Sequence, residues 1–502
     1  MRHWLQRWAR GVWRAVVLGA ALPLLAAAAE RNIVLFVGDD LGTTLGCYGD
    51  QVALTSNADR LAREGIVFRQ AFCTTASCSA SRSVLLSGLH NHRNGHYGHQ
   101  HDYHKFSSHP WVQTLPVMLG RMGYRTARIG KHHNGPEEVY LFDLKLPGTG
   151  RNPVEMADQC EAFLKAKDPR PFFLHFATAD PHRGGGNATE LAHTPNRFGN
   201  RPDRGEHLGV REVFYEPAKV PVPAFLPDTP QTRAELSQYY QSVSRVDQGL
   251  GRLVELLKKS GQWERTLLIF TSDHGMAFAG AKTTVYEPGL RVPFLMHNPY
   301  AKVRGANSEA MISLADVTPT LLDFAGGLDA AQGAAKPAAV AAAAVAAAGK
   351  GAKGGPYRFH GRTLLPLLAK DNPPGWDFHF ASHTFHEIQM YYPMRVVRGR
   401  QYKLIWNLAH PLPFPFASDL WDAPSWQAQW KLGLDAPYGR KSVRQYVHRP
   451  QFELYDLVAD PHETRNLASD PKHAAVLSDY KSRLKRYQQE TQDPWIQKWD
   501  YE

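Results

Sequence analysis

Residues 32–38 read NIVLFVG, and two aspartates, Asp39 and Asp40, follow this run directly. After Asn32 the run is continuously apolar and shows no alternation of polar and apolar residues, which is typical of a strand buried on both faces of a sheet. Four similar runs occur further along the chain, namely RTARIG (125–130), PFFLHFA (171–177), RTLLIF (265–270) and VPFLMH (292–297). These runs predict the central strands of one large, mostly parallel sheet.

Helical patterns lie between these runs. The longest covers residues 232–258, where eight apolar residues recur at helical spacing: Leu236, Tyr239, Tyr240, Val243, Val246, Leu250, Leu253 and Leu257. Strands that alternate with helices favour a doubly wound α/β fold, in which helices cover both faces of the sheet. From about residue 356 the pattern changes to short aromatic-rich segments, which predict a smaller α+β domain with an antiparallel sheet.

The chain of 502 residues is longer than one hydrophobic core usually organises, so we expect two domains. We place the larger domain at residues 30–327 and the smaller one at residues 356–502. Between them, residues 328–355 are rich in alanine and glycine and carry no side chains able to build a core. This composition indicates a low-complexity insertion rather than a domain.

The first 29 residues have a basic start, an apolar middle and an Ala-x-Ala ending near Ala29, which is typical of a signal peptide. The alternative, a membrane anchor, is less favoured because the apolar run from Ala15 to Ala29 is shorter than a bilayer crossing requires. We therefore expect an exported protein, periplasmic or secreted, or lysosomal in a eukaryote, with no membrane span after cleavage. The formal charge of +11 includes no lysine or arginine block of the length typical of a nucleic-acid arm, so we expect no nucleic-acid partner.

Acids, histidines and a lysine follow four of the predicted strands immediately. The groups are Asp39 and Asp40, Lys131 and His133, Asp180 and His182, and Asp273 and His274. Each group alone is compatible with an ordinary loop, but ligands bind beyond the carboxyl ends of the strands in open α/β sheets. Adjacent carboxylates repel unless a cation holds them, so Asp39, Asp40 and Asp273 predict a divalent metal with oxygen ligands.

Residues 78–88 read CSASRSVLLSG. This segment resembles the signature of the type I sulfatases, in which a cysteine is followed by x-Pro/Ala-Ser-Arg and then by x-x-x-Leu-Thr/Ser-Gly. The same family pattern includes GDD (38–40), GK (130–131), DPH (180–182), SDHG (272–275) and RVP (291–293). The resemblance covers the mature chain except the insertion. It implies an alkaline-phosphatase-like fold with the catalytic sulfatase domain at residues 30–327.

The resemblance also implies the cofactors. A maturation enzyme would oxidise Cys78 to formylglycine, whose hydrate offers one hydroxyl that attacks sulfate and a second that later expels it. A divalent metal is implied, with Ca²⁺ expected and Mg²⁺ or Mn²⁺ as alternatives. Its ligands would be Asp39, Asp40, modified Cys78, Asp273 and His274. In sulfamidases, which are members of this family, an asparagine stands at the position of His274, and imidazole is a less typical calcium ligand than an amide oxygen.

The remaining site residues receive their roles from the same resemblance. Arg82, one helical turn after Cys78, would hold the hydrate, and Lys131 and Lys282 would stabilise the charge on the sulfuryl group. His133 would take a proton when sulfate is expelled, and His182 would protonate the leaving group, since histidine titrates in the useful range.

Further segments resemble the sulfamidases, which remove the N-linked sulfate from terminal glucosamine in heparan sulfate. They are NGHYGHQHDYHKF (94–106), MYYPMRVV (390–397) and LYDLVADPHETRNLASDP (454–471). The overlapping stretch SHTFHEIQMYYPMR (382–395) offers His386 and Glu387 to bind sugar hydroxyls. We therefore expect a sulfated glycan substrate, most specifically N-sulfoglucosamine at a terminal position, and the resemblance allows a homodimer.

Three other functions remain open from the sequence. The first is an O-sulfatase that acts on another sulfated sugar. The second is a phosphodiester or phosphonate monoester hydrolase of the same superfamily, which can share the formylglycine and the Asp-His metal pair. The third is an exported glycan-binding protein that keeps the fold without chemistry, although every catalytic position of the family pattern is filled.

Overall fold

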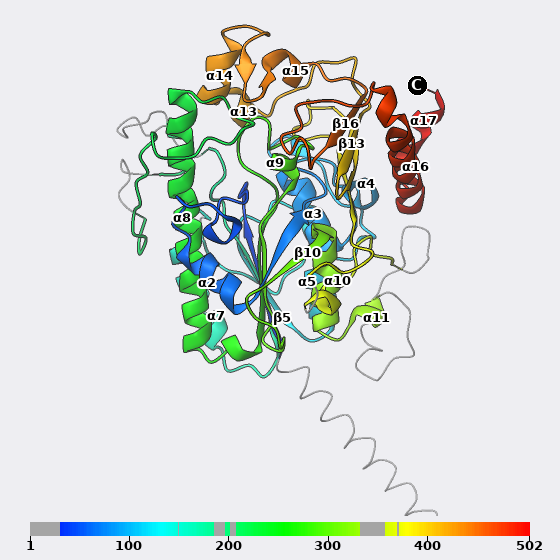
Figure 1. Ribbon diagram of the computed structural model, residues 1–502. Coiled ribbons are helices and arrows are strands. Elements are labelled where there is room, and N and C mark those ends of the chain that lie inside the picture. The colour runs from blue at the N-terminus through cyan, green and yellow to red at the C-terminus, as the bar shows by residue number, and fades with distance from the viewer. Residues whose placement is uncertain are drawn as a thin grey trace, which may run out of the picture.

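A computed structural model describes residues 31–148, 150–184, 196–200, 207–331, 357–368 and 371–501 (Figure 1). The predicted signal peptide, residues 1–29, lies outside the described residues. The same holds for residues 332–355 of the predicted insertion. The first residues of that insertion form the short helix α11 (Leu328–Ala331).

The larger sheet has eight strands in the order β10-β2-β9-β8-β1-β7-β5-β6. They are β1 (Asn32–Gly38), β2 (Ile66–Phe72), β5 (Arg125–Gly130), β6 (Leu144–Lys145), β7 (Phe172–Ala177), β8 (Thr266–Ser272), β9 (Phe294–His297) and β10 (Ala306–Ser313). Strand β9 pairs antiparallel with β2 and β8, and the other neighbouring strands are parallel. The sheet is therefore mostly parallel, as the apolar runs predict.

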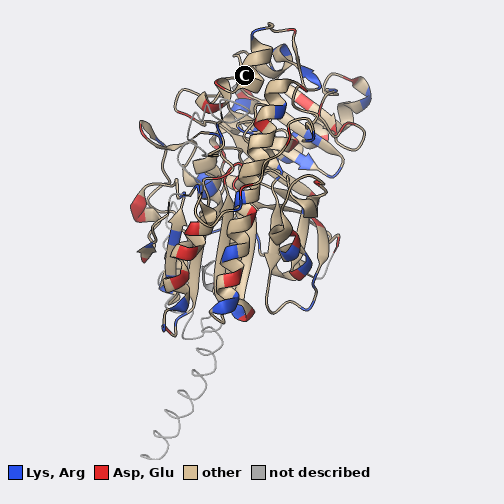
Figure 2. Cartoon of the chain, turned by 90° about the vertical axis from the view of Figure 1, so that its left-hand side faces the viewer, with Lys and Arg blue, Asp and Glu red and all other residues tan. Residues whose placement is uncertain are grey.

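Helices cover both faces of the larger sheet (Figure 1). Helices α2 (Ser56–Glu64), α7 (Glu161–Lys165) and α8 (Pro230–Lys259) lie on one face, and α3 (Cys78–Ser87), α5 (Leu115–Arg121) and α10 (Val317–Phe324) lie on the other. Helix α8 contains the predicted helical stretch 232–258. The Thr229 side chain caps its first turn by accepting a hydrogen bond from the Thr232 backbone N–H. Figure 2, which faces the side of the molecule that carries α8, shows basic and acidic residues alternating along the helices there. The helices on both faces of the larger sheet confirm the predicted doubly wound fold.

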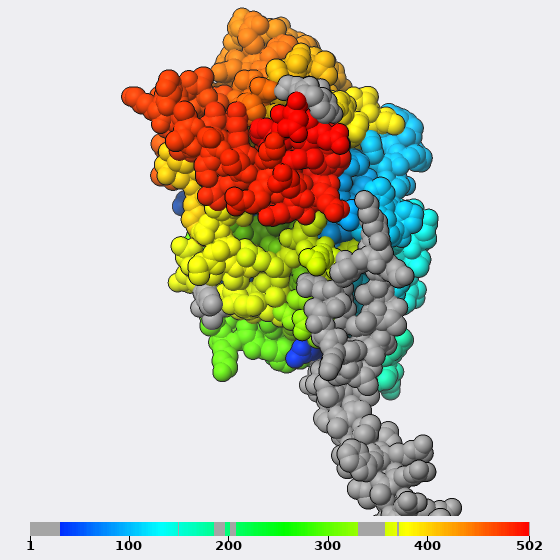
Figure 3. Space-filling model, turned by 90° about the vertical axis from the view of Figure 1, so that its right-hand side faces the viewer, coloured from blue at the N-terminus to red at the C-terminus, as the bar shows by residue number. Residues whose placement is uncertain are grey.

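The C-terminal region forms a second, antiparallel sheet. Its four strands, in the order β11-β12-β13-β16, are β11 (Phe378–His383), β12 (Met394–Gly399), β13 (Tyr402–Asn407) and β16 (Phe452–Asp456). Helix α16 (Ala474–Thr491) packs on this sheet, where Tyr480 and Leu484 join an apolar cluster with Leu404 and Leu454. Figure 3 shows the end of the chain, coloured red, on the surface of the molecule. The antiparallel sheet predicted for this region is confirmed.

The two sheets share one apolar core. A single cluster of buried residues contains Phe36 and Ile269 of the larger sheet together with Val396 and Ile405 of the smaller one. The backbone N–H of Ser382 in β11 also donates a 2.8 Å hydrogen bond to the carbonyl of Thr74, just before α3. The C-terminal region therefore packs against the segment that leads into α3. The domain limits 30–327 and 356–502 stay predictions.

Within the described part of the chain, none of the helices has both the length and the apolar character that a bilayer crossing needs.

Candidate active site

The loops that follow β1, β8, β5 and β7 meet at one edge of the larger sheet. The backbone N–H of Asp39, after β1, donates to the carbonyl of Asp180, after β7. The N–H of Asp273, after β8, donates to the carbonyl of Gly38. Four strand ends therefore bring the predicted acids and histidines together, as expected for the carboxyl edge of an open α/β sheet.

Helix α3 begins at Cys78 and carries the sulfatase-like motif into this edge. Ser77 precedes it in extended backbone, and Gly88 ends it in the left-handed region at φ +67°. All ten residues of the helix are buried. The Cys78 Sγ lies 3.3 Å from His274 Nε2 and 3.7 Å from Asp40 Oδ1. The helix therefore presents the sulfur directly to the predicted metal ligands.

Arg82 lies one helical turn after Cys78 and binds the carboxylates of Asp39 and Asp273. Its Nε donates to Asp273 Oδ2 at 3.0 Å, and its Nη2 donates to Asp39 Oδ1 at 2.8 Å. A third bond runs from Nη1 to the Lys131 carbonyl. Burial would raise the pKa of Asp39, but Lys131 and Arg82 hold it well below its ordinary value. Arg82 thus fixes loops from three different strands with one side chain, which is 1% exposed.

A group of four residues could hold a metal ion. The ligand atoms of Asp40, Cys78, Asp273 and His274 all lie within 4.8 Å of one another, and all four residues are buried. Asp40 also belongs to a second such group with Asp39 and His182. The structure therefore brings all five predicted metal ligands to one place, although Asp39 stands in the second group.

The charges around this group fit a cation. His274 Nε2 lies 3.0 Å from Asp40 Oδ1. Burial would lower the pKa of His274, but Asp273 and Asp40 raise it well above its ordinary value. Burial raises the pKa of Asp273 to about 6. These carboxylates therefore favour a positive charge beside them, and carboxylate oxygens are the ligands that hard divalent ions prefer.

Lys282 connects this group to a residue that the sequence reasoning missed. Its Nζ donates to Asp40 Oδ2 at 3.1 Å and to Asp419 Oδ2 at 2.8 Å, and it lies 3.1 Å from His182 Nε2. Asp419 belongs to the short helix α13 (Ser418–Trp421) in the C-terminal region. Burial, Lys131 and Lys282 lower the pKa of His182 to about 3. In this state the imidazole of His182 is neutral and accepts from Lys282.

Lys131 and His133 stand in the loop that follows β5. The Lys131 Nζ lies 2.5 Å from Asp39 Oδ2. His133 has a left-handed backbone at φ +57°, and both of its ring nitrogens are shielded from solvent without a hydrogen-bond partner among the described residues. Its ring centroid lies 4.8 Å from that of His99. The ring of His133 is therefore held by packing rather than by polar contacts.

The predicted sugar-binding residues His386 and Glu387 lie on the loop between β11 and β12. His386 Nδ1 is 2.9 Å from Ser77 Oγ, and its Nε2 is 2.8 Å from His99 Nε2. Glu387 Oε1 accepts hydrogen bonds from the backbone N–H and the hydroxyl of Ser418. The structure thus brings this loop beside the start of α3, with the polar atoms of both side chains engaged by neighbouring residues.

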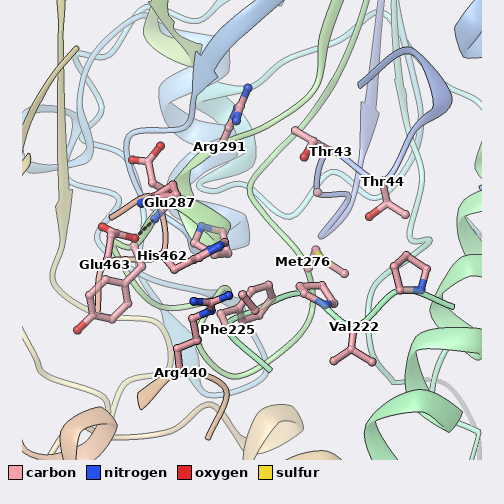
Figure 4. Close-up of a pocket in the computed structure, with 18 of the residues that line it drawn as sticks. Thr43, Thr44, Val222, Phe225, Met276, Glu287, Arg291, Arg440, His462 and Glu463 are labelled. Atoms are coloured by element: carbon pink, nitrogen blue, oxygen red, sulfur yellow. Dashed lines mark hydrogen bonds between the residues drawn. The ribbon is translucent and has the colours of Figure 1, made fainter. Parts of the chain in front are cut away.

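A cavity of about 710 Å³ lies beside the loops after β1 and β8 (Figure 4). Thr43 and Met276 line one side of it, and Glu287, Arg291 and Arg440 lie on the opposite side in this view. Its lining contains none of the site residues that the sequence predicts. The cavity is therefore a separate feature from the cluster around Cys78.

Comparisons with known proteins agree with this arrangement. The sulfatase family model matches residues 31–327. The chain is 38% identical to human N-sulphoglucosamine sulphohydrolase over 483 residues, which cover 94% of this chain and 92% of the human protein. It is 26% identical to an ulvan-active sulfatase of Formosa agariphila over 463 residues, which cover 90% of this chain and 78% of that protein.

Two solved structures share the fold. BT4656, in complex with its substrate D-glucosamine-2-N,6-O-disulfate, superposes with a TM-score of 0.62 at 21% identity over 92% of this chain and 98% of its own. The phosphonate monoester hydrolase of Agrobacterium radiobacter gives a TM-score of 0.63 at 19% identity over 92% of this chain and 96% of its own. With a family match across residues 31–327 and a human relative that is similar along nearly its whole length, the chain belongs to the sulfatase family.

Proposed function

We propose that this sulfatase hydrolyses the N-sulfate of terminal N-sulfoglucosamine in heparan sulfate or heparin fragments. The observation that carries the chemistry is the position of Cys78 at the start of α3, with its Sγ 3.3 Å from His274 Nε2 and Arg82 one turn away. The similarity to human N-sulphoglucosamine sulphohydrolase supports the choice of sugar, and the fold shared with BT4656 is compatible with it.

The cofactors follow from the donor set. Asp39, Asp40, Asp273 and His274 would hold a divalent cation, with Ca²⁺ proposed first because most of these donors are carboxylate oxygens, and Mg²⁺ or Mn²⁺ as alternatives. The cation would polarise a sulfate oxygen, and formylglycine made from Cys78 would supply the nucleophilic hydroxyl.

The side chains of this chain then perform the remaining tasks. Lys131 pairs with Asp39 and Lys282 pairs with Asp40, so both lysines are placed to neutralise the charge of a sulfate bound at these carboxylates. We assign Arg82 to orient residue 78. His133 has free ring nitrogens within the described residues and would accept the proton released when sulfate leaves.

Cleavage of an N-sulfate expels an amine, which is too basic to leave without a proton. We assign His182 as the donor, with Lys282 beside its Nε2. Because Lys131 and Lys282 help to keep the pKa of this imidazole at about 3, an anionic sulfate bound between them would offset their effect and raise the pKa towards the useful range.

Sugar recognition is proposed for the loop with His386 and Glu387. Each carboxylate oxygen has two lone pairs, so Glu387 can accept a sugar hydroxyl while Oε1 keeps its bonds to Ser418. His386 holds His99 and Ser77 in place and would meet the sugar through the edge of its ring.

We further propose that the protein is exported after removal of residues 1–29 and that a maturation enzyme converts Cys78. In this proposal residues 30–327 form the catalytic domain, residues 328–355 an insertion, and residues 356–502 the smaller domain. Ala80 stands where proline is more usual, so a radical-type maturase that tolerates Cys-x-Ala-x-Arg is proposed over the oxygen-dependent enzyme.

The test is sulfate release from matched substrates by protein made together with a maturation enzyme. N-sulfoglucosamine at a non-reducing end should be cleaved fastest, with glucosamine 6-O-sulfate and aryl sulfate slower. Release from the 6-O-sulfated sugar alone would retain the sulfatase chemistry and contradict the N-sulfate specificity. Faster turnover of an aryl phosphate or phosphonate monoester would favour a phosphoester hydrolase, and sulfate binding without turnover would favour a glycan-binding protein.

A further inference from the structure

Three histidine rings form a compact triangle beside the candidate active site. The ring centroids of His99 and His133 lie 4.8 Å apart, and His101 lies 5.0 Å from each of them. Their nearest nitrogen atoms all lie within 4.8 Å of one another. This histidine triad therefore has the spacing of a group that could hold one metal ion.

The triad is built by two separate segments. His101 ends the short strand β3 (Gln100–His101), which pairs with β4 (His104–Lys105) in a two-stranded hairpin. The hairpin is fixed by a hydrogen bond of 2.8 Å from the His99 backbone N–H to the His386 carbonyl. His133 comes from the loop after β5. Arg82 donates to the carbonyl of Lys131 in that loop. The hairpin and the loop that carry the three rings are therefore both held by hydrogen bonds, so little ordering is needed to bind an ion.

The donor set differs from that of the group around Cys78. The triad offers three imidazole nitrogens and no carboxylate oxygen, which suits Zn²⁺ and similar transition metals rather than Ca²⁺ or Mg²⁺. Burial lowers the pKa of both His99 and His133 well below the ordinary value, so these rings are neutral, as a metal ligand must be.

The surroundings of the rings resemble those of metal-bound histidines. The Nδ1 of His101 lies 3.0 Å from the Asp102 carboxylate, and the Nδ1 of His99 lies 3.4 Å from Ser79 Oγ. A metal-ligating histidine usually donates its other ring N–H to such a partner. His133 adds an independent sign, since its two solvent-shielded ring nitrogens have no hydrogen-bond partner within the described residues. A native polar group of this kind calls for a ligand or a water.

We propose that His99, His101 and His133 bind a Zn²⁺-class ion at a site separate from the carboxylate-rich group. The His101 side chain is 43% exposed, so the ion has a path from solvent. His99 would exchange one of its contacts, to Ser79 or to His386, for the metal. The bound ion would occupy His133 and thereby inhibit sulfate release. This inhibition rests on the proposed function, whereas the binding itself does not.

The experiment measures Zn²⁺ binding by equilibrium dialysis to the mature enzyme with its own metal in place and excess Ca²⁺ present. Wild-type protein should bind one additional Zn²⁺, and Co²⁺ in its place should give the visible absorption of a nitrogen-bound ion. Loss of a partner that orients a metal-bound histidine typically lowers metal affinity by about 10- to 100-fold. His101→Gln removes a ligand itself, so it should lower Zn²⁺ affinity by more than this. Asp102→Asn removes only an orienting partner, so its loss of Zn²⁺ affinity should lie within that range. The control is His448→Gln, which changes an exposed histidine outside the triad.

The activity of the same proteins gives a second readout. Without Zn²⁺, His101→Gln should retain wild-type turnover, and added Zn²⁺ should inhibit wild type and His448→Gln but not His101→Gln. Equal Zn²⁺ affinity in wild type and His101→Gln would contradict the proposed Zn²⁺ site. Zn²⁺ that binds only by displacing Ca²⁺ would also contradict it. Binding that depends on His101 but leaves activity unchanged would keep the site and contradict the role of His133 in the reaction.

Discussion

Lys282 Nζ lies 2.8 Å from Asp419 Oδ2 and 3.1 Å from His182 Nε2, so an acid from the C-terminal region holds the lysine against the proposed proton donor. Asp419→Asn should weaken this hold and lower kcat, at the low end of the about 10²–10⁴-fold range of general acid catalysis. Metal content should stay unchanged. The control Asp422→Asn alters an exposed acid just after the same helix and should match wild type. A loss of metal in Asp419→Asn would contradict this role.

Asp40 belongs to both groups of potential metal ligands, which makes it the most informative carboxylate to remove. Its left-handed backbone at φ +60° tolerates asparagine, so Asp40→Asn should fold. We expect loss of the bound divalent ion, measured by elemental analysis, together with loss of turnover, and chelation of wild type should have the same effect. Asp435→Asn, at an exposed acid, serves as the control. An active Asp40→Asn protein with full metal content would refute the assignment.

Cys78 is the predicted site of oxidation, and three other cysteines provide internal comparison. Peptide mass spectrometry should find formylglycine at residue 78 and intact thiols at Cys47, Cys73 and Cys160. Cys78→Ala should abolish turnover, because it removes the nucleophile. Cys73→Ala, at another buried cysteine, should retain it. Fully active protein with an unmodified Cys78 thiol would contradict the proposed chemistry.

Arg395 and Asp493 form a buried ion pair that ties the end of the chain to strand β12. Asp493→Asn leaves the guanidinium unpaired and should reduce the free energy of unfolding by about 3–5 kcal/mol at neutral pH. The control Asp479→Asn, at an exposed acid of α16, should change it by less than about 0.5 kcal/mol. Urea denaturation measures both changes.

The same pair predicts the direction of a pH effect. Burial would raise the pKa of Asp493, but Arg395 holds it well below the ordinary carboxylate value of about 3.9. The ion pair therefore stabilises the folded protein fully at pH values above this ordinary pKa. The stabilisation is lost as the pH falls through the lower pKa that Asp493 has in the folded state. Wild type and Asp493→Asn should thus differ most above about pH 5 and converge in acid. A difference that widens on acidification would contradict the assignment.

The insertion gives a prediction that depends on composition alone. Residues 332–354 consist mainly of alanine, glycine and lysine, and loop closure depends only weakly on length. Replacing them with a short Gly-Ser linker should leave Tm and turnover nearly unchanged. A large decrease in either quantity would mean that the insertion packs against the folded protein.

Much of the fold could be predicted because buried parallel strands leave a strong pattern. The runs at 32–38, 125–130 and 171–177 correspond closely to β1, β5 and β7. Strands β2 and β10 were missed, since Arg69 and Gln70 interrupt one and polar residues alternate through the other. The apolar pattern also does not predict that β9 is antiparallel to its neighbours, because an apolar run has no marker of parallel or antiparallel pairing.

The site was predictable where chemistry follows a strand and much less so elsewhere. Asp39 and Asp273 stand at strand ends, and Cys78 lies in a specific motif. Asp419 gives no such signal, because it lies on a four-residue helix within an aromatic-rich segment and reaches Lys282 only through tertiary packing. His99 likewise stands in a histidine-rich stretch whose folding partner, His133, is distant in sequence.

The complete burial of Cys78 sets an order of events for its proposed oxidation during biosynthesis. The loops after β1 and β8 contact Cys78 through Asp40 and His274, and the late segment around His386 contacts the preceding residue, Ser77. The folded protein therefore buries the thiol and offers no access for an enzyme that must bind the peptide around it. The proposed oxidation of Cys78 would therefore compete in time with translation and folding. A host in which the nascent chain collapses before its maturase arrives would yield stable, well-folded and permanently inert protein. Expression yield is then a poor measure of success, and the modified fraction is the quantity to follow.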